Sequence, residues 1–308
     1  MSVMTELQNV RSSPKSSGSK RDRVAYVFLI PWLIGLVGIT LGPMLASLIL
    51  AFTDYNLLQA PQFIGLDNFI EMASDKRLAN SLQVTFTYVF VSVPLQLIIA
   101  LLVAVLLDRG LRGLSIYRSI FYLPSLLGSS VAVAILWRQM FGADGLVNQL
   151  LAFVGIHDAP GWVTDPSTAL GTIILLNVWT FGAPMIIFVA GLRQIPEMYY
   201  EAAEIDGAGR WTRFRRITLP LLSPIVFFNL VLQLIGAFQS FTQAFVVSGG
   251  NGGPADSTMF YSLYLYQQGF NQFNMGYAAA LAWLLFVIIG AFTAINFIAS
   301  KYWVFYDN

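Results

Sequence analysis

The stretch EAAEIDGAGRWTRFRRITLP occupies residues 201–220 and separates two strongly apolar segments. It carries both charge signs, and five of its residues are Ala or Gly, which lets another protein surface approach the backbone closely. A polar segment in this setting is either a solvated connection or a docking surface. The stretch is therefore a first indication of a partner.

The composition points to a membrane protein. Of the 308 residues 56% are hydrophobic and only 11% are charged, with a mean hydropathy of +0.67, whereas soluble domains carry about 25% charged residues. Cysteine is absent, so neither a disulfide framework nor a thiolate metal site is available. The one histidine, His157, lies in a polar stretch, where a solvated side chain is far more common than a metal ligand.

Six apolar runs are each near or above the roughly 20 residues that a bilayer requires, which predicts an all-α integral membrane protein with six spans. The predicted spans lie at about residues 24–52, 81–107, 117–137, 169–192, 219–247 and 276–300. The Ser-rich tail at 1–23 is predicted to be disordered. Residues 24–302 are predicted to form one transmembrane domain with a polar connection at 193–218, and residues 303–308 a short end.

The basic residues predict the orientation. Fourteen of the 17 Lys and Arg residues lie in the tail, in the connections at 108–118 and 193–218, and at the C-terminal end. By the positive-inside rule both termini and the 201–220 stretch are cytoplasmic, and the loops near Asp67, Asp158 and Asp256 are external. Topology and lipid headgroups also account for the cluster at 210–216 without nucleic acid. The exceptions on the external side are Lys76, Arg77 and Arg138.

The cores of the predicted spans contain no Asp, Glu, Lys, Arg or His. Proton-coupled transporters and voltage sensors need such charges at depth, and an intramembrane hydrolase needs a general base or a metal cage. An enzyme is therefore not expected. A sodium-coupled transporter remains an alternative, because backbone carbonyls can hold its ion.

The fourth and fifth spans instead contain neutral polar and aromatic residues. Amides and hydroxyls bind other hydroxyls without carrying charge, and aromatic faces pack against sugar rings, so this lining suits a neutral polyhydroxylated solute. The alternative role for each residue is hydrogen bonding between helices. The residues are Asn177, Trp179, Thr180, Asn229, Gln233, Gln239, Ser240, Thr242 and Gln243.

Residues 201–220 also match the pattern E-A-A, three residues, G, nine residues, I-x-L-P, at Glu201, Ala202, Ala203, Gly207, Ile217, Leu219 and Pro220. This resembles the EAA loop of the permease subunits of ATP-binding-cassette (ABC) importers. Other stretches resemble the carbohydrate branch of that family, which includes the maltose, glycerol-phosphate and trehalose permeases. They are FIGLDNF at 63–69, RGLRGLSIYRSIFYLP at 109–124, Trp137, GLRQIPEMYYEAA at 191–203, NGGP at 251–254 and MGYAAALAWLLF at 275–286.

The resemblance implies a type I ABC importer permease fold in the bacterial inner membrane. It also implies three kinds of partner beyond membrane lipid: a second permease subunit, two cytoplasmic ATPase subunits and an extracytoplasmic substrate-binding protein. The chain contains no G-x-x-x-x-G-K-[ST] motif, so ATP and Mg²⁺ are expected on the ATPase subunits and no cofactor on this chain.

In such permeases the EAA loop forms a short coupling helix that inserts into the ATPase. Pro196 and Glu197 suit the first turn of that helix and Gly207 its end. Three- and four-residue spacing predicts one face formed by Tyr199, Ala202, Ala203 and Asp206. Glu201 either accepts hydrogen bonds from the ATPase or braces the local fold, and both roles remain open.

The resemblance to the maltose permease implies that this chain contacts its substrate at Asn177, Thr180, Phe181, Gln233 and Ser240. The expected cargo is a neutral di- or oligosaccharide or related glycoside moving into the cytoplasm. Glycerol phosphate or a polyamine are the alternatives within the same class of transporter, but they would need charged groups near the path.

Overall fold

The computed structural model describes residues 28–108 and 113–305. The expectations for the tail at 1–23 and for residues 306–308 lie outside these residues. In the described part the chain is almost entirely helical, which confirms the all-α class, and one isolated β-bridge joins Thr53 and Phe63.

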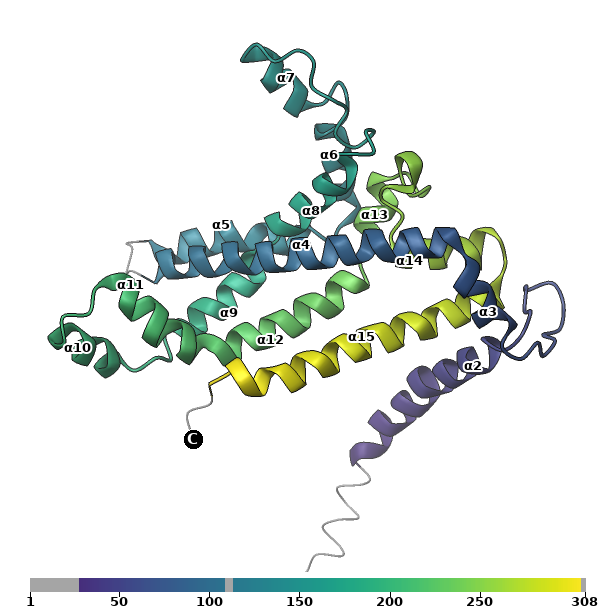
Figure 1. Ribbon diagram of the computed structural model, residues 1–308, viewed down its shortest axis with the longest axis horizontal. Helices are drawn as coiled ribbons and strands as arrows, with labels where there is room; N and C mark the ends of the chain where they lie inside the picture. The colour runs from purple at the N-terminus through teal and green to yellow at the C-terminus, as the bar shows by residue number, and fades with distance from the viewer. Residues whose placement is uncertain (1–27, 109–112, 306–308) are drawn as a thin grey trace, which may run out of the picture.

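The helices follow one another along the chain in this order (Figure 1). They are Leu36–Leu41, which is π-helical, α2 (Gly42–Leu50), α3 (Asp67–Ser74), α4 (Lys76–Leu107), α5 (Leu114–Leu127), α6 (Val131–Met140), α7 (Leu146–Phe153), α8 (Ala169–Trp179), α9 (Gly182–Leu192), α10 (Glu197–Ile205), α11 (Arg210–Arg213), the π-helical Phe214–Thr218, α12 (Leu219–Phe238), α13 (Thr242–Val247), the 3₁₀ turn Pro254–Asp256, α14 (Tyr261–Tyr266), the π-helical Gln267–Asn271, and α15 (Met275–Trp303).

Five helical stretches of the described chain are long and apolar enough to cross a bilayer, and a bent pair brings the number to six. The five are Phe28–Leu50, Lys76–Leu107, Ala169–Leu192, Arg210–Phe238 and Met275–Trp303. α4 packs against α8, α9 and α12, and α12 packs in turn against α15, as Figure 1 shows. The multi-pass architecture predicted from hydropathy is therefore present.

The third predicted span, at 117–137, is not one straight helix. α5 ends at Leu127, α6 begins at Val131, and the two axes differ by 95°. Gly128 ends α5, and a Cβ there would lie 2.1 Å from Cγ2 of Thr180, so the break is packed tightly against the fourth span. Ser130 then caps α6, because its Oγ accepts a hydrogen bond from the Val133 amide at 3.3 Å.

The fifth predicted span, at 219–247, has different limits. Its helix begins at Arg210, inside the predicted polar connection, and ends at Phe238, after which α13 starts separately at Thr242. The apolar run thus contains a helix end that hydropathy does not detect. A similar break at 180–181, between α8 and α9, interrupts the fourth span.

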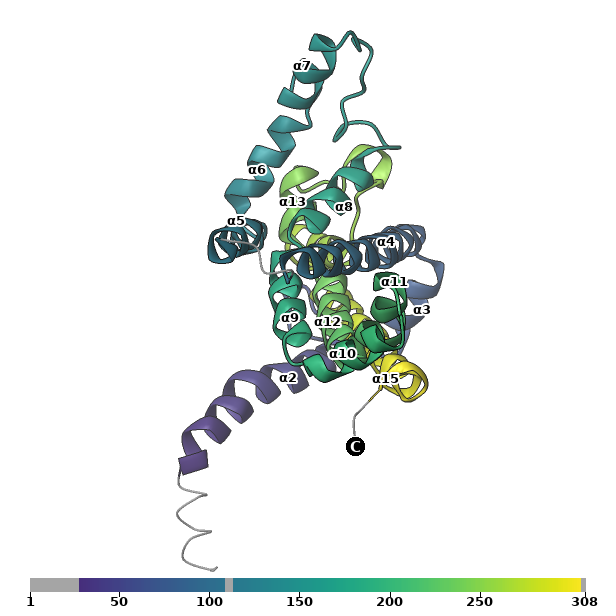
Figure 2. The same ribbon diagram turned by 90° about the vertical axis from the view of Figure 1, so that its left-hand side faces the viewer.

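The first helix stands apart from the bundle. In Figures 1 and 2 it leaves the other helices at an angle and meets α15 only near its C-terminal end. Trp283 Nε1 donates to Ser47 Oγ there at 3.2 Å. None of the residues in its most apolar 18-residue window is buried, so this surface is left for lipid or another chain.

Candidate functional site

The EAA stretch forms a short helix whose two ends are defined by local chemistry. Pro196, with an extended ψ of 133°, precedes α10, and Glu197 places a negative charge in its first turn, where the helix dipole favours it. At the other end the Ala208 amide donates to Ala203 O at 2.9 Å and the Gly207 amide to Glu204 O at 3.0 Å. Gly207 has φ +73°, so the helix ends in a Schellman motif.

Two side-chain contacts fix α10 to the helix that follows it. Arg213 Nη1 lies 2.9 Å from Glu204 Oε2, and the hydroxyls of Tyr200 and Thr218 are 3.0 Å apart. Figure 1 shows α10 and α11 together at the end of the bundle farthest from α3 and α14. These contacts therefore attach α10 to the N-terminal turns of the helix that forms the fifth span.

The EAA residues fall into two environments. Glu201, Ala202, Asp206 and Gly207 are exposed and Ala203 is half-buried on α10. The three remaining motif residues lie half-buried at the start of the long helix and take no part in the exposed surface: Ile217, Leu219 and Pro220.

Two exposed apolar residues of α10 were not anticipated from the sequence. Met198 is 66% exposed and Ile205 87% exposed. With Ala202 they recur at four- and three-residue spacing, so they share one face of the helix. The sequence does contain the pattern that identifies this face, because apolar residues recur at helical spacing inside a polar connection. Such a surface is typical of a helix that docks on another protein.

Glu201 makes no side-chain hydrogen bond or ion pair with any residue in the described part of the chain, and its side chain is exposed. The carboxylate that contributes to bracing is instead Glu204, through Arg213. Within the described residues the Glu201 side chain therefore makes no bracing contact.

A second polar group lies at the break in the fourth span. The amide of Gln96, a residue of α4 that is 2% exposed, donates to Asn177 O at 3.0 Å and to Thr180 Oγ1 at 3.0 Å. Ser125 of α5 donates to Thr180 O and accepts from the Ala183 amide, both at 2.8 Å. The carbonyls freed by the break are thus satisfied by two neighbouring helices, as irregular backbone at membrane depth requires.

The breaks in three spans meet at this level. Gln243, just after the end of α12, donates to Gly128 O at 3.3 Å, and Ser240 Oγ lies 3.3 Å from Gln243 Oε1. Gly128 also packs against Thr180. The structure therefore brings the neighbourhoods of Thr180 and Ser240 together around Gly128, which sequence reasoning did not identify.

The other predicted substrate-path residues are placed differently. Phe181 is half-buried and packs against Phe121 with ring centroids 5.9 Å apart. Gln233 is half-buried on α12 and makes no side-chain hydrogen bond with another described residue. Asn177 and Thr180 already bond to Gln96. Among the predicted substrate-path residues, Gln233 therefore has the most freely available side-chain amide.

One charge lies closer to the membrane than expected. α5 begins at Leu114, so Arg118 is on its second turn rather than in the preceding connection. Its Nε and Nη2 atoms are buried and have no hydrogen-bond partner among the described residues. The bundle is therefore not free of charge at the start of α5.

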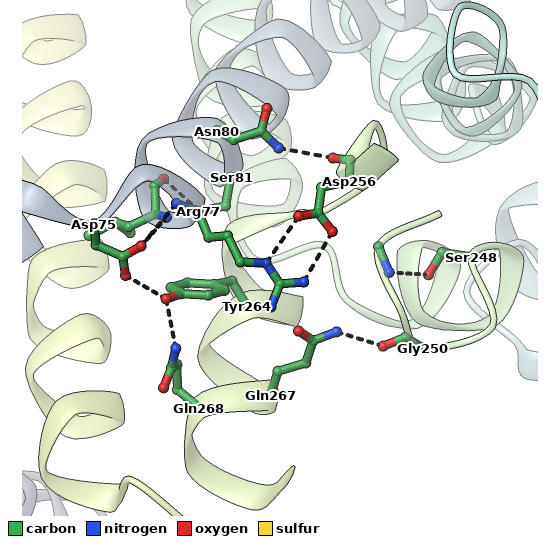
Figure 3. Close-up of polar contacts among 12 residues, drawn as sticks. Asp75, Arg77, Asn80, Ser81, Ser248, Gly250, Asp256, Tyr264, Gln267 and Gln268 are labelled. Atoms are coloured by element: carbon green, nitrogen blue, oxygen red, sulfur yellow. Dashed lines mark hydrogen bonds and ion pairs between the residues drawn. The ribbon is translucent and has the colours of Figure 1, made fainter. Parts of the chain in front are cut away.

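The opposite end of the bundle carries a third polar network, shown in Figure 3. The Asp75 carboxylate caps α4 by accepting from the Arg77 and Leu78 amides, and it also accepts from the hydroxyls of Tyr264 and Tyr277. Burial raises the pKa of Asp75, but these hydrogen bonds outweigh burial and hold its pKa below the usual value. A single carboxylate thus joins α4, α14 and α15.

The same network holds the loop between α13 and α14. Arg77 forms a two-pronged ion pair with Asp256, at 3.0 and 3.1 Å, while Asn80 donates to Asp256 O at 3.0 Å. Gln267 donates to Gly250 O at 2.8 Å (Figure 3). Asp256 itself has φ +55°, a conformation these contacts must maintain.

Residues 28–108 and 113–305 contain no group of three or more His, Cys, Asp or Glu side chains placed to hold a metal ion.

Known proteins resemble this chain over most of its length. The family model described as "Binding-protein-dependent transport system inner membrane component" matches residues 69–300. The probable ABC transporter permease protein YesP of Bacillus subtilis is 54% identical over 296 residues, covering 96% of each chain. The lactose transport system permease protein LacF of Rhizobium radiobacter is 34% identical over 285 residues, covering 91% of this chain and 95% of that one.

A solved structure supports the fold. A chain in the crystal structure of a bacterial alginate ABC transporter, in complex with an alginate pentasaccharide-bound periplasmic protein, superposes with a TM-score of 0.80 at 23% identity. The superposition covers 92% of this chain and 95% of that one. The family match, the two relatives and the shared fold confirm the resemblance seen in the motifs, and this chain belongs to the family of binding-protein-dependent transport system inner membrane components, as a multi-pass permease of the ABC type.

Proposed function

We propose that this permease moves a neutral di- or oligosaccharide, or a related glycoside, into the cytoplasm. It works with a second permease subunit, two ATPase subunits that carry ATP and Mg²⁺, and an extracytoplasmic substrate-binding protein. The observation that carries the proposal is the exposed apolar and acidic surface of α10, which has no partner in the described chain and is held to the fifth span.

Energy enters at α10. Met198, Ala202 and Ile205 dock on an ATPase subunit, and the exposed Glu201 accepts charge-assisted hydrogen bonds from it. Glu204 and Tyr200 carry the resulting movement to the helix that begins at Arg210. In this proposal Glu201 docks on the ATPase subunit and Glu204 braces α10, which the Glu204–Arg213 ion pair supports.

The level where three spans are broken is the proposed substrate path. Discontinuous helices in transporters expose backbone and side-chain dipoles to a solute near the middle of the membrane. Gln233 and Ser240 offer amide and hydroxyl groups to sugar hydroxyls there, and Phe181 offers an aromatic face. The lactose-named relative is consistent with a sugar as cargo.

The test is to purify the chain with its partner subunits and measure which sugars stimulate ATP hydrolysis through the binding protein. We expect stimulation by a neutral oligosaccharide, and we expect Gln233→Ala or Ser240→Ala to reduce uptake while basal ATP hydrolysis persists. Uptake that follows a sodium gradient without any bound ATPase would instead establish the secondary-transporter alternative.

A further inference from the structure

A cavity of about 520 Å³ lies at the cytoplasmic end of the bundle, between α4 and the start of the fifth span. Leu102 and Val105 of α4 form its apolar wall, and Tyr200 and Thr218 line it near α10. Three residues at the boundary of the membrane complete the polar side: Arg210, Trp211 and Arg213. The cavity is therefore amphipathic, with an apolar part at membrane depth and a cationic part at the surface.

The charges around the cavity leave one cation without a counter-charge. Arg213 is paired with Glu204 at 2.9 Å, and Asp108, which also lines the cavity, is 3.6 Å from Arg193. Arg210 makes no ion pair with a residue of the described chain. The cavity thus offers a single positive charge to a ligand, which matches one phosphodiester.

An exposed apolar stripe runs along α4 into this cavity. Leu95, Ile98, Leu102 and Leu106 are 42%, 54%, 55% and 54% exposed. Their three- and four-residue spacing places them on one face of a helix that is long enough to cross the bilayer. Leu102 belongs to both the stripe and the cavity wall, so the cavity is continuous with a hydrocarbon-facing surface.

We propose that this cavity binds one anionic phospholipid of the cytoplasmic leaflet. The phosphate lies against Arg210, and an acyl chain follows the stripe on α4. Trp211, which is 71% exposed and stacked on Phe214 at 5.6 Å, lies at the level of the headgroups, where Trp is typical of membrane proteins. A bound lipid would join α4, α10 and the fifth span at the point where we place energy entry, but its binding does not depend on the cargo.

The test uses the purified complex of all subunits with phosphatidylglycerol as the probe and phosphatidylethanolamine for comparison. Lipid retained after detergent washing is counted by native mass spectrometry for the natural chain and for Arg210→Gln, Val105→Trp and Arg215→Gln. Arg215→Gln is the matched control, because it removes an equal charge from an exposed residue of the same helix that does not line the cavity. Val105→Trp fills the cavity without changing the charge.

We expect Arg210→Gln and Val105→Trp to retain phosphatidylglycerol about fivefold less well than the natural chain, and Arg215→Gln to retain it normally. Equal loss in Arg210→Gln and Arg215→Gln would show diffuse surface attraction and overturn the proposal. Displacement of the lipid by millimolar inorganic phosphate would overturn it too, since the cavity would then be a site for a soluble anion. Sugar-stimulated ATP hydrolysis, measured on the same preparations, tests the proposed function separately.

Discussion

At the scale of single residues, Gly207 shows how a motif residue is explained by backbone geometry. Its φ of +73° is required to close the Schellman motif, and nothing lies within 4 Å of a Cβ built on it. The requirement is therefore conformational rather than steric. A β-branched side chain in this conformation costs about 1–2 kcal/mol, which is enough to unwind the last turn of a nine-residue helix.

Replacing Gly207 with Val should reduce co-purification of the ATPase subunits while membrane insertion stays normal, because only the end of α10 is disturbed. Asn, which tolerates the left-handed conformation, should restore much of the binding. Gly209→Ala is the control, since Gly209 has φ −67° and open space around it. Normal ATPase binding by Gly207→Val would refute the role given to this turn.

The Asp75 carboxylate is expected to make the stability of the protein depend on pH. Its pKa is lowered in the folded protein, so its contribution to stability is complete above its ordinary value of 3.8 and is lost as the pH falls through the lower folded value. Asp75→Asn should destabilise the purified protein at neutral pH by on the order of 1 kcal/mol, a modest effect because the carboxylate is partly exposed. Thermal unfolding monitored from pH 7 to pH 3 measures both effects.

In the same experiment the stability of the Asp75→Asn variant should fall less on acidification than that of the natural chain. Asp158→Asn, which changes an exposed loop carboxylate, should leave the unfolding curve unchanged. If the natural chain and Asp75→Asn lost stability in parallel on acidification, another group would account for the dependence.

At the scale of elements, hydropathy predicted where the membrane helices are but not where they break. Residues 117–137 and 219–247 read as continuous apolar runs, yet the helices end at Leu127 and Phe238. The breaks depend on long-range partners. Gly128 must pack on Thr180, and Gln96 must reach the carbonyl of Asn177, 81 positions along the chain. A local sequence pattern cannot reveal such long-range contacts.

The short helix α10 was predictable because its determinants are local. Pro196, Glu197 and Gly207 define its ends within the segment itself. The exposure of Ile205 was not predicted, since it depends on the direction in which Glu204 and Tyr200 hold the helix. The candidate substrate path was predictable only as a set of residue types, because the meeting of three breaks is a tertiary feature.

Gln96 therefore provides a direct test of the broken fourth span. Gln96→Leu preserves the size of the side chain but leaves buried acceptors at the break without their donor, at a cost of about 1–3 kcal/mol. We expect a lower unfolding temperature and slower sugar uptake. Gln83→Leu on the exposed side of α4 is the matched control, and equal unfolding temperatures for the two variants would exclude this role for Gln96.

At the scale of the whole molecule, α4 joins the two ends of the protein. Its 32 residues span about 48 Å, from the Asp75 network at one end to Asp108, which is paired with Arg193 just before α10, at the other. The core of the bundle packs along its length. A displacement at α10 can therefore reach the loop that Arg77 holds by rigid movement of packed helices, without a separate relay.

The distribution of Lys and Arg predicts the orientation of α4 in the membrane, and the absence of cysteine makes this orientation directly measurable. Gln59 and Gln194 are exposed and lie in connections assigned to opposite sides, so a single cysteine in place of either reports the side on which it lies. A membrane-impermeant maleimide should label Gln59→Cys in intact spheroplasts and Gln194→Cys only after the membrane is opened. The cysteine-free parent controls for background. Labelling of Gln194→Cys in intact spheroplasts would reverse the orientation, and would place α10 on the side where no ATPase subunit can reach it.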